Sequence, residues 1–315
     1  MSNLTEEVGR LLRMPQQKPE YVFQPLQVLR TLARRRSRPE TYVVVTLPWG
    51  VPLRIRPSDN IGRAIWRTGI YDLPLTEAIL RLASPGETAV DVGANIGLMT
   101  AAMATAVGKR GRVFSFEPLP ELFDELGDNV NRWLGELGWS HVCTDASALS
   151  NRDGVASLRV PTSFAANRGT ATLRASAEEH DVVTVSVRTL DGALEGVERV
   201  GVLKVDVEGH ELQVFEGAQR LLEAGRVRDI LFEDYHPYPS PVTERLSSLG
   251  YEIRSVRKGL LGPKLLLPGG NHFDPSFELP NYLATRDLQR ATAKFAPIGW
   301  RALRQQGVGQ LTDGG

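Results

Sequence analysis

Apolar and polar residues follow two different periods along most of this chain. From residue 88 onward, short apolar runs bounded by Gly, Pro, Asn or Asp alternate with longer segments whose apolar residues recur at helical spacing. This order predicts an α/β fold, in which a mostly parallel sheet of seven strands carries helices on both faces. The expected strands are 88–92, 112–116, 141–146, 202–207, 230–235 and 251–256, with a seventh near 264–267.

The first 84 residues predict an N-terminal cap made of helices and a hairpin. Helical spacing between 5 and 36 is broken by Pro15, Pro19 and Pro25, so helix pieces are expected there. Two β-type runs at 41–47 and 51–56 flank a Pro-Trp-Gly turn, which is typical of a hairpin. Residues 61–83 return to helical spacing, with interruptions at Gly69 and Pro74.

Two other regions depart from the alternation of strands and helices. Between 151 and 190 the runs are short and alternating, which predicts an inserted β-hairpin region that faces the substrate. The chain therefore divides into a cap at 1–84, a nucleotide-binding domain at 85–280 that contains the insertion 151–190, and a tail at 281–315. The tail either closes over the core or mediates a homodimer.

Composition and charge narrow the class of protein. The chain has 315 residues, 42% of them hydrophobic, which is enough for one large core. Its 37 basic and 37 acidic residues cancel, so we expect a small-molecule substrate and neither nucleic acid nor membrane as a partner. The lone Cys143 rules out an internal disulfide and a Cys-based zinc site, and we expect a free buried thiol. The N-terminus resembles neither a signal peptide nor a membrane span, which favours a cytoplasmic enzyme.

The most informative motif is a glycine turn between two expected strands. The strand 88–92 carries Asp91, the turn runs from Gly93 to Gly97, and the next strand is followed by Glu117. A carboxylate about 20 residues beyond such a turn binds ribose hydroxyls in nucleotide-binding units. Asp91 would repel a pyrophosphate and attract an ammonium group, which favours S-adenosylmethionine over NAD. An NAD-dependent oxidoreductase, a non-catalytic binding protein and a tight turn without a ligand are the alternatives.

Acids and a histidine follow two later strands. Asp206 and Glu208 end the strand 202–207, where open α/β sheets bind ligands; alternatively, they stabilise the start of the next helix. Glu233 and His236 end the strand 230–235, where His236 is either a base or a surface histidine before a proline turn. Among the candidate bases Asp206, Glu208 and His236, we favour His236, because an ordinary carboxylate accepts protons poorly unless burial raises its pKa. A divalent ion on these groups is an alternative that we do not expect.

These motifs together resemble the FkbM family of class I S-adenosylmethionine-dependent methyltransferases. The resemblance runs from Val51 to Leu283. Its motifs are Asp59-Asn60-Ile61, Gly69-Ile70-Tyr71-Asp72, Asp91-Val92-Gly93-Ala94-Asn95-Ile96-Gly97, Phe116-Glu117-Pro118, Asn167-Arg168-Gly169, Thr189-Leu190-Asp191 and Leu203-Lys204-Val205-Asp206-Val207-Glu208-Gly209-His210-Glu211. Asp72 stands where the family usually has Glu.

The resemblance implies a Rossmann-like methyltransferase domain at 85–280 that uses S-adenosylmethionine and releases S-adenosylhomocysteine. The residues that it implies for the cofactor are Asp91, Gly93, Ala94, Asn95 and Gly97 for the methionine part, Glu117 and Pro118 for the ribose, Asp145 or the backbone from Ala146 to Ser147 for the adenine, and Asp206 beside the methyl group. The catalytic candidates are Asp206, Glu208, Glu233 and His236, and the candidates for the acceptor pocket are Tyr71, Asn167, Arg168 and Tyr238.

The family's acceptors imply the reaction. We expect O-methylation of a hydroxyl on a sugar, a polyketide or another product of secondary metabolism. Methylation of a carboxylate and a metal-assisted O-methylation are the alternatives within the family. Methyl transfer is an in-line displacement, so holding the two reactants in position is expected to supply most of the catalysis.

Overall fold

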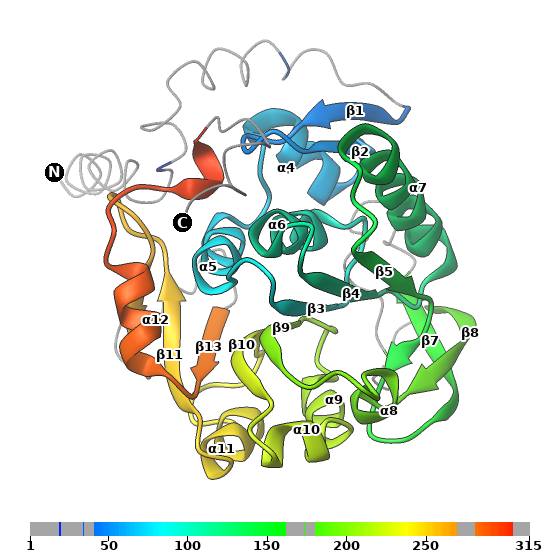
Figure 1. Cartoon of the computed structure of the whole chain (residues 1–315). Helices are drawn as coiled ribbons and strands as arrows, with labels where there is room; N and C mark the ends of the chain where they lie inside the picture. Colours follow the sequence, from blue (N-terminus) through cyan, green and yellow to red (C-terminus); the bar gives the residue numbers. More distant parts are fainter. Residues whose placement is uncertain are drawn as a thin grey trace, which may run out of the picture.

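The computed structural model describes Pro19, Arg34, residues 41–161, Leu173, residues 180–269 and residues 281–304. The helix pieces predicted between 5 and 36 lie outside this part, apart from Pro19 and Arg34. A sheet of eight strands crosses the described part and is covered by helices on both faces (Figure 1). This arrangement confirms the predicted α/β class.

The strands of the central sheet run in the order β12-β11-β13-β10-β9-β3-β4-β5. Five neighbours, β10, β9, β3, β4 and β5, are parallel, so their carboxyl ends meet at one edge of the sheet. The bounds are β3 Thr88–Val92, β4 Arg112–Phe116, β5 Val142–Asp145, β9 Val200–Val205, β10 Val227–Glu233, β11 Glu252–Arg257, β12 Lys264–Leu266 and β13 Asn281–Thr285.

Strand β13 was not predicted, so the predicted number of seven strands was wrong by one. It lies antiparallel between β10 and β11, and all five of its residues are buried. A strand buried on both faces shows no alternation of apolar and polar residues, and this one is only five residues long. Residues 281–285 therefore belong to the sheet, although we had assigned them to the tail. The division into three domains otherwise stays a prediction.

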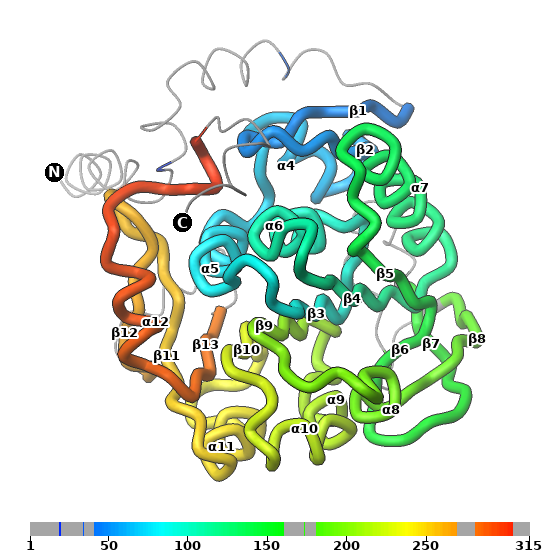
Figure 2. Tube along the Cα trace, viewed as in Figure 1, coloured from blue at the N-terminus to red at the C-terminus, as the bar shows by residue number. Residues whose placement is uncertain are grey.

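Helices from different parts of the chain cover the two faces, as the tube in Figure 2 shows. Each face has its own apolar cluster. On one face lie the hairpin of β1 (Val43–Thr46) and β2 (Pro52–Ile55) and the helices α4 (Asn60–Thr68), α5 (Leu73–Leu82), α6 (Leu98–Val107) and α7 (Pro120–Leu137). On the other lie α8 (Leu190–Ala193), α9 (Glu211–Glu216), α10 (Gln219–Glu223) and α11 (Pro241–Ser248). Within the described residues, no helix has the length and apolar character that crossing a bilayer would need.

The predicted interruptions at Gly69 and Pro74 correspond to the connection between α4 and α5. Gly69 ends α4 in the left-handed region, with φ of 82°, which glycine adopts without strain. Asp72 caps α5 by accepting a hydrogen bond from the Leu75 N–H at 2.9 Å, and Pro74 lies in the first turn, where its missing N–H costs nothing. This connection brings Tyr71 and Asp72 to the carboxyl edge of the sheet.

The predicted inserted hairpin is also present. Strands β7 (Gly154–Pro161) and β8 (His180–Arg188) are antiparallel, and the short β6 (Ala148–Leu149) pairs with β8. Arg188 at the end of β8 forms an ion pair with Asp145 at the end of β5, with 2.7 Å between Nη1 and Oδ2. The ion pair links the insertion to the edge of the central sheet.

Cys143 lies on β5, the edge strand of the sheet. Its thiol is free, as predicted, but the residue is exposed, so the expected burial was wrong. Since β5 has a neighbouring strand on one side only, the rim of the sheet leaves this side chain open to solvent.

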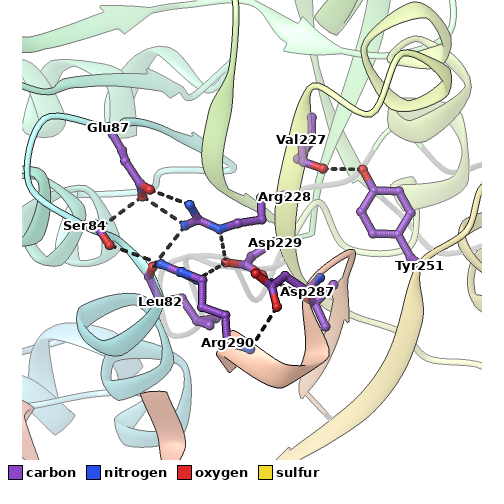
Figure 3. Close-up of polar contacts among 10 residues, drawn as sticks. Leu82, Ser84, Glu87, Val227, Arg228, Asp229, Tyr251, Asp287 and Arg290 are labelled. Atoms are coloured by element: carbon purple, nitrogen blue, oxygen red, sulfur yellow. Dashed lines mark hydrogen bonds and ion pairs between the residues drawn. The ribbon is translucent and has the colours of Figure 1, made fainter. Parts of the chain in front are cut away.

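A partly buried ionic network lies at the end of the sheet opposite the carboxyl ends of the parallel strands (Figure 3). The Asp229 side chain is fully buried at the start of β10. It accepts hydrogen bonds from Arg228 Nε at 2.9 Å, Arg290 Nη1 at 3.0 Å and Thr285 Oγ1 at 2.6 Å. Arg228 also donates to Glu87 Oε2 at 3.0 Å. The network joins β10 to β13, to the loop before β3 and to α12 (Leu288–Phe295).

The segment after β13 packs onto α5. Arg81, only 1% exposed, donates to Glu77 Oε1 at 2.6 Å and to the carbonyl oxygens of Phe295 at 3.1 Å and Gly299 at 2.6 Å. Glu77 in turn accepts the N–H of Ala302 at 2.8 Å. Of the two roles predicted for the tail, closing over the core is therefore observed for its described residues. Homodimerisation stays a prediction.

Candidate active site

The glycine turn after β3 is held against the end of β9. A Cβ on Gly93 would lie 1.9 Å from the carbonyl oxygen of Asp206, so the turn can approach this closely only with glycine at 93. Gly97 begins α6 with φ of 94°, and a Cβ there would lie 2.8 Å from Leu126 Cδ1. The turn is therefore a fixed cradle whose shape its two glycines determine.

Lys204 on β9 holds this turn through contacts of its buried ammonium group. Its Nζ donates to the carbonyl oxygen of Gly93 at 2.7 Å and lies 3.3 Å from Asp91 Oδ1 and 3.5 Å from Asp206 Oδ2. Burial alone would lower the pKa of this ammonium, but Asp91 and Asp206 outweigh it and raise the pKa. The sequence motif contained this lysine, and its charge within an apolar strand was a signal, but we had assigned it no role.

Asp91 does not face the space above the turn. Its side chain is fully buried, accepts a hydrogen bond from Thr100 Oγ1 at 2.7 Å and is paired with Lys204. Asp91 is therefore not placed to attract the ammonium group of a cofactor as we expected, because it is buried and Lys204 balances its charge. Asp206, Glu208 and Glu233 line the acidic cavity instead.

Glu117 lies where a ribose is expected. It is 6% exposed, and its carboxylate accepts the N–H groups of Asn95 at 2.8 Å and Leu119 at 3.0 Å. Burial raises its pKa to about 7, although these two hydrogen bonds oppose the rise. A carboxylate has about four acceptor positions, so two hydroxyl groups can still bind to it.

Two cavities meet at Gly93 and Glu117, which line both of them. One, of about 480 Å³, is mostly apolar, and the other, of about 820 Å³, is acidic. An adenine in the apolar cavity, a ribose at Glu117 and an amino-acid part above the turn fit this pair of spaces. The apolar cavity is lined by Phe116, Pro118, Ser147, Leu149, Leu158, Val207 and His210, among others. The acidic cavity is lined by Tyr71, Asp72, Ala94, Asn95, Lys204, Asp206, Glu208 and Glu233, among others.

The residues expected at the adenine differ in their surroundings. Asp145 accepts the N–H of Ser147 at 2.8 Å and is paired with Arg188; these contacts outweigh desolvation and lower its pKa. Asp145 and Ala146 are not among the residues that line either cavity, whereas Ser147 and His210 line the apolar one. His210 was quoted in the motif without a role. Gly97 likewise shapes the turn without lining a cavity.

Three of the four candidate catalytic residues, Asp206, Glu208 and Glu233, line the acidic cavity. Glu208 sits in the loop after β9 with φ of 55°, a left-handed conformation that is uncommon outside glycine. Glu211 braces this loop by accepting the N–H groups of Val207 at 3.2 Å and Gly209 at 3.0 Å. The loop thereby directs the Glu208 carboxylate into the cavity, where it accepts a hydrogen bond from the hydroxyl of Tyr235.

Burial and mutual repulsion change how these acids titrate. Burial raises the pKa of Glu208 to about 7, and Asp206 adds to the rise, whereas the Tyr235 hydroxyl opposes it. Burial raises the pKa of Glu233 to about 9, and Asp206, Asp72 and Glu208 add to the rise. Burial and the neighbouring carboxylates therefore favour the protonated form of Glu233, and burial also favours the protonated form of Glu208.

The fourth candidate, His236, lies apart from the three acids. Its side chain is 53% exposed, with Nδ1 3.0 Å from Oδ1 of the buried Asp234. Neither His236 nor Tyr238 is among the residues lining the two cavities, whereas Tyr71 lines the acidic one. Asn167 and Arg168 lie outside the described residues. Where the chain is described, no group of three or more acids, histidines or cysteines has an arrangement suited to a metal ion.

Comparison with known proteins places the chain in a family. Residues 91–253, more than half of the chain, match the family profile described as "Methyltransferase FkbM domain". The chain is 33% identical to the hexuronic acid methyltransferase AglP of Haloferax volcanii over 62% of this chain and 77% of AglP. It is 25% identical to the AMB antimetabolite synthetase AmbE of Pseudomonas aeruginosa over 86% of this chain, but it spans only 14% of that protein.

Solved structures show more distant likenesses. The methyltransferase FkbM of Methylobacillus flagellatus matches with a TM-score of 0.43 and 17% identity, over 66% of this chain and 50% of that one. The fibrillarin of Aeropyrum pernix, solved with natively bound S-adenosyl-L-methionine, matches with a TM-score of 0.36 and 17% identity, over 79% of this chain and 96% of that one. The family match over residues 91–253 spans the glycine turn, Glu117 and the cavity acids Asp206, Glu208 and Glu233, and by that match this chain belongs to the FkbM family of S-adenosylmethionine-dependent methyltransferases.

Proposed function

We propose that this protein transfers a methyl group from S-adenosylmethionine to a hydroxyl group of a small molecule: a sugar, a polyketide or another secondary metabolite. One observation carries the proposal: the glycine turn and the carboxylates of Asp206, Glu208 and Glu233 face a single cavity of about 820 Å³. This cavity has room for an acceptor beside the amino-acid part of the cofactor. The name of AglP, a hexuronic acid methyltransferase, supports a sugar as the acceptor.

The residues that would hold the cofactor follow from the two cavities. When bound, S-adenosylmethionine supplies an electrophilic methyl carbon on a sulfonium. Glu117 would accept the ribose hydroxyls, Ser147 would border the adenine, and the turn at Gly93 would carry the methionine part. Asp206, whose side chain is 34% exposed, would face the sulfonium side. Such fixed positioning of two reactants can supply roughly 7 to 11 kcal/mol of the barrier.

Glu208 is the base that this geometry supports best. A sugar hydroxyl is a weak nucleophile, and a base that removes its proton adds about 10² to 10⁴-fold to the rate. We had favoured His236 because an ordinary carboxylate accepts protons poorly. With its pKa raised to about 7, Glu208 meets this objection, and it lines the cavity while His236 does not.

Glu233 would act as a hydrogen-bond donor to the acceptor. Burial and the neighbouring carboxylates raise its pKa and so favour its protonated form. A protonated carboxyl group donates one hydrogen bond and accepts others, which suits a substrate that carries several hydroxyl groups. Glu233 would thus orient the acceptor, and Glu208 would accept the proton.

Carboxylate methylation is a second candidate, because the relative's name specifies a hexuronic acid, which carries both kinds of acceptor group. A carboxylate is already a nucleophilic anion and needs no base. The two reactions therefore differ in their dependence on Glu208: loss of its carboxylate slows methylation of a hydroxyl group and spares methylation of a carboxylate.

A paired-acceptor experiment tests the proposal. The enzyme is incubated with S-adenosylmethionine carrying an isotopically labelled methyl group and either a glucuronic acid glycoside or the matching glucose glycoside, and the products are analysed by mass spectrometry. We expect transfer to both compounds as a methyl ether, which survives mild alkali. An alkali-labile product formed from the uronic acid alone would replace the proposal with carboxylate methylation. Calorimetry that detected binding of NAD and none of S-adenosylhomocysteine would refute both.

A further inference from the structure

We infer that Tyr235 is a positioning residue for methyl transfer, because its phenol hydroxyl holds the carboxylate of Glu208 in the acidic cavity. The inference rests on the proposed function, in which Glu208 is the base. Nothing in the sequence pointed to Tyr235, which lies in the loop between Glu233 and His236.

The two residues come from neighbouring parallel strands. Glu208 follows β9 and Tyr235 follows β10, and these strands are paired with Phe232 opposite Val205. The loops that leave them at the carboxyl edge are therefore side by side, and the hydroxyl of Tyr235 donates to Oε2 of Glu208 across the gap. Because Glu211 braces only the backbone N–H groups of the Glu208 loop, the contact from Tyr235 adds a constraint on the side chain itself.

The charges around Glu208 explain why such a donor is needed. Asp206 on its own strand end and Glu211 at the start of α9 both disfavour an ionised Glu208. Glu208 in turn raises the pKa of Glu233 at the end of β10, which favours a neutral Glu233. Lys204 favours the ionised form, and Tyr71, at the edge of α5, is a neutral phenol whose pKa burial raises to about 12. A hydroxyl donor stabilises the ionised carboxylate without adding a charge.

Tyr235 contributes little to the core, so its hydroxyl can be tested alone. The residue is 45% exposed, and replacement by phenylalanine keeps its ring. Tyr251, whose hydroxyl donates to the carbonyl oxygen of Val227 at 2.7 Å, provides a control, because Val227 lies at the opposite end of β10 from Glu233. A residue with a purely structural role would change the melting temperature and leave the titration of Glu208 unchanged.

The test is a pH titration of the enzyme with saturating S-adenosylhomocysteine. Glutamate side chains are labelled with ¹³C at the carboxyl carbon, and the resonance missing from the Glu208→Gln variant is assigned to Glu208. We expect a midpoint near pH 7 in the wild type. In Tyr235→Phe we expect it about one pH unit higher, since a hydrogen bond to a charged group at a half-exposed site is worth about that much. Tyr251→Phe should keep the wild-type midpoint.

Kinetic measurements then test separately the role of Tyr235 and the role of Glu208 as the base. The rate of methyl transfer to the glucose glycoside is measured against pH for the same variants. In Tyr235→Phe, the rise of kcat with pH should move to higher pH by the same amount as the midpoint of Glu208. At pH values above this rise, kcat should approach that of the wild type. An unchanged midpoint and an unchanged profile in Tyr235→Phe would overturn the inference. A profile that keeps its rise near pH 7 in Glu208→Gln would instead remove Glu208 as the base, whatever Tyr235 does.

Discussion

Replacing Lys204 by methionine tests how the cofactor turn is supported. Lys204 is 3% exposed, and its Nζ lies within 3.5 Å of the Gly93 carbonyl oxygen, Asp91 and Asp206. Methionine fills a similar volume but leaves the fully buried Asp91 with only the hydroxyl of Thr100 as an observed hydrogen-bond donor. Removing one partner of a buried ion pair costs about 3–5 kcal/mol, which is a large share of a typical stability of about 5–15 kcal/mol.

Urea unfolding measures the effect of Lys204→Met on stability, and calorimetry measures its effect on the binding of S-adenosylhomocysteine. We expect Lys204→Met to lower the free energy of unfolding by about 3–5 kcal/mol. Because Lys204 also holds the Gly93 carbonyl, we expect the affinity for S-adenosylhomocysteine to fall by about tenfold, the equivalent of about one lost hydrogen bond. Lys264→Met, at an exposed position on the edge strand β12, should change stability by no more than about 0.5 kcal/mol.

A double variant shows whether the buried charge of Asp91 is the cause. Asp91→Asn removes this charge, so the combination with Lys204→Met should be more stable than the sum of the two single effects by at least about 1 kcal/mol. A cost below about 1 kcal/mol for Lys204→Met, or strictly additive effects in the double variant, would refute this account of the pair.

Four further results are expected. Glu117→Gln should weaken S-adenosylhomocysteine binding about tenfold in calorimetry. In the wild type, affinity should fall as pH drops through about 7, because the ionised carboxylate is the better acceptor for ribose hydroxyls; equal binding by Glu117→Gln would place the ribose elsewhere. His236→Gln should keep turnover within about twofold, whereas a loss of 10² or more would restore His236 as the base. EDTA should leave activity unchanged, and loss with recovery on adding Mg²⁺ would contradict this. Arg81→Met should lower the free energy of unfolding by about 3–5 kcal/mol and speed tryptic cleavage after residue 286, while Arg132→Met, at a partly exposed helix position, should do neither.

Local signals predicted the nucleotide-binding half of the fold well. Strands β3 and β4 match the predicted residues, because each is a short apolar run next to a glycine turn or a helix with clear periodicity. The positions of Gly93 and Glu117 follow from the same short segment. Since this unit is continuous in the sequence, its geometry depends little on distant residues.

Contacts between distant segments could not be predicted in this way. Lys204 and Asp91 are more than a hundred residues apart, so their pairing and the burial of Asp91 depend on β9 lying beside β3. The raised pKa of Glu208 depends on burial, which the sequence does not reveal. For this reason the sequence favoured His236, the one candidate whose ordinary pKa suits a base.

The position of β13 has a consequence for how the protein is made. Its five residues follow β11 and β12 in the sequence but lie inside the sheet, between β10 and β11. While residues 281–285 are still to be synthesised, β10 exposes a row of unpaired backbone groups on a buried, apolar strand, an arrangement that invites aggregation. A nascent chain can thus form the glycine turn and Glu117 early, while this edge of β10 stays open until residues 281–285 pair with it.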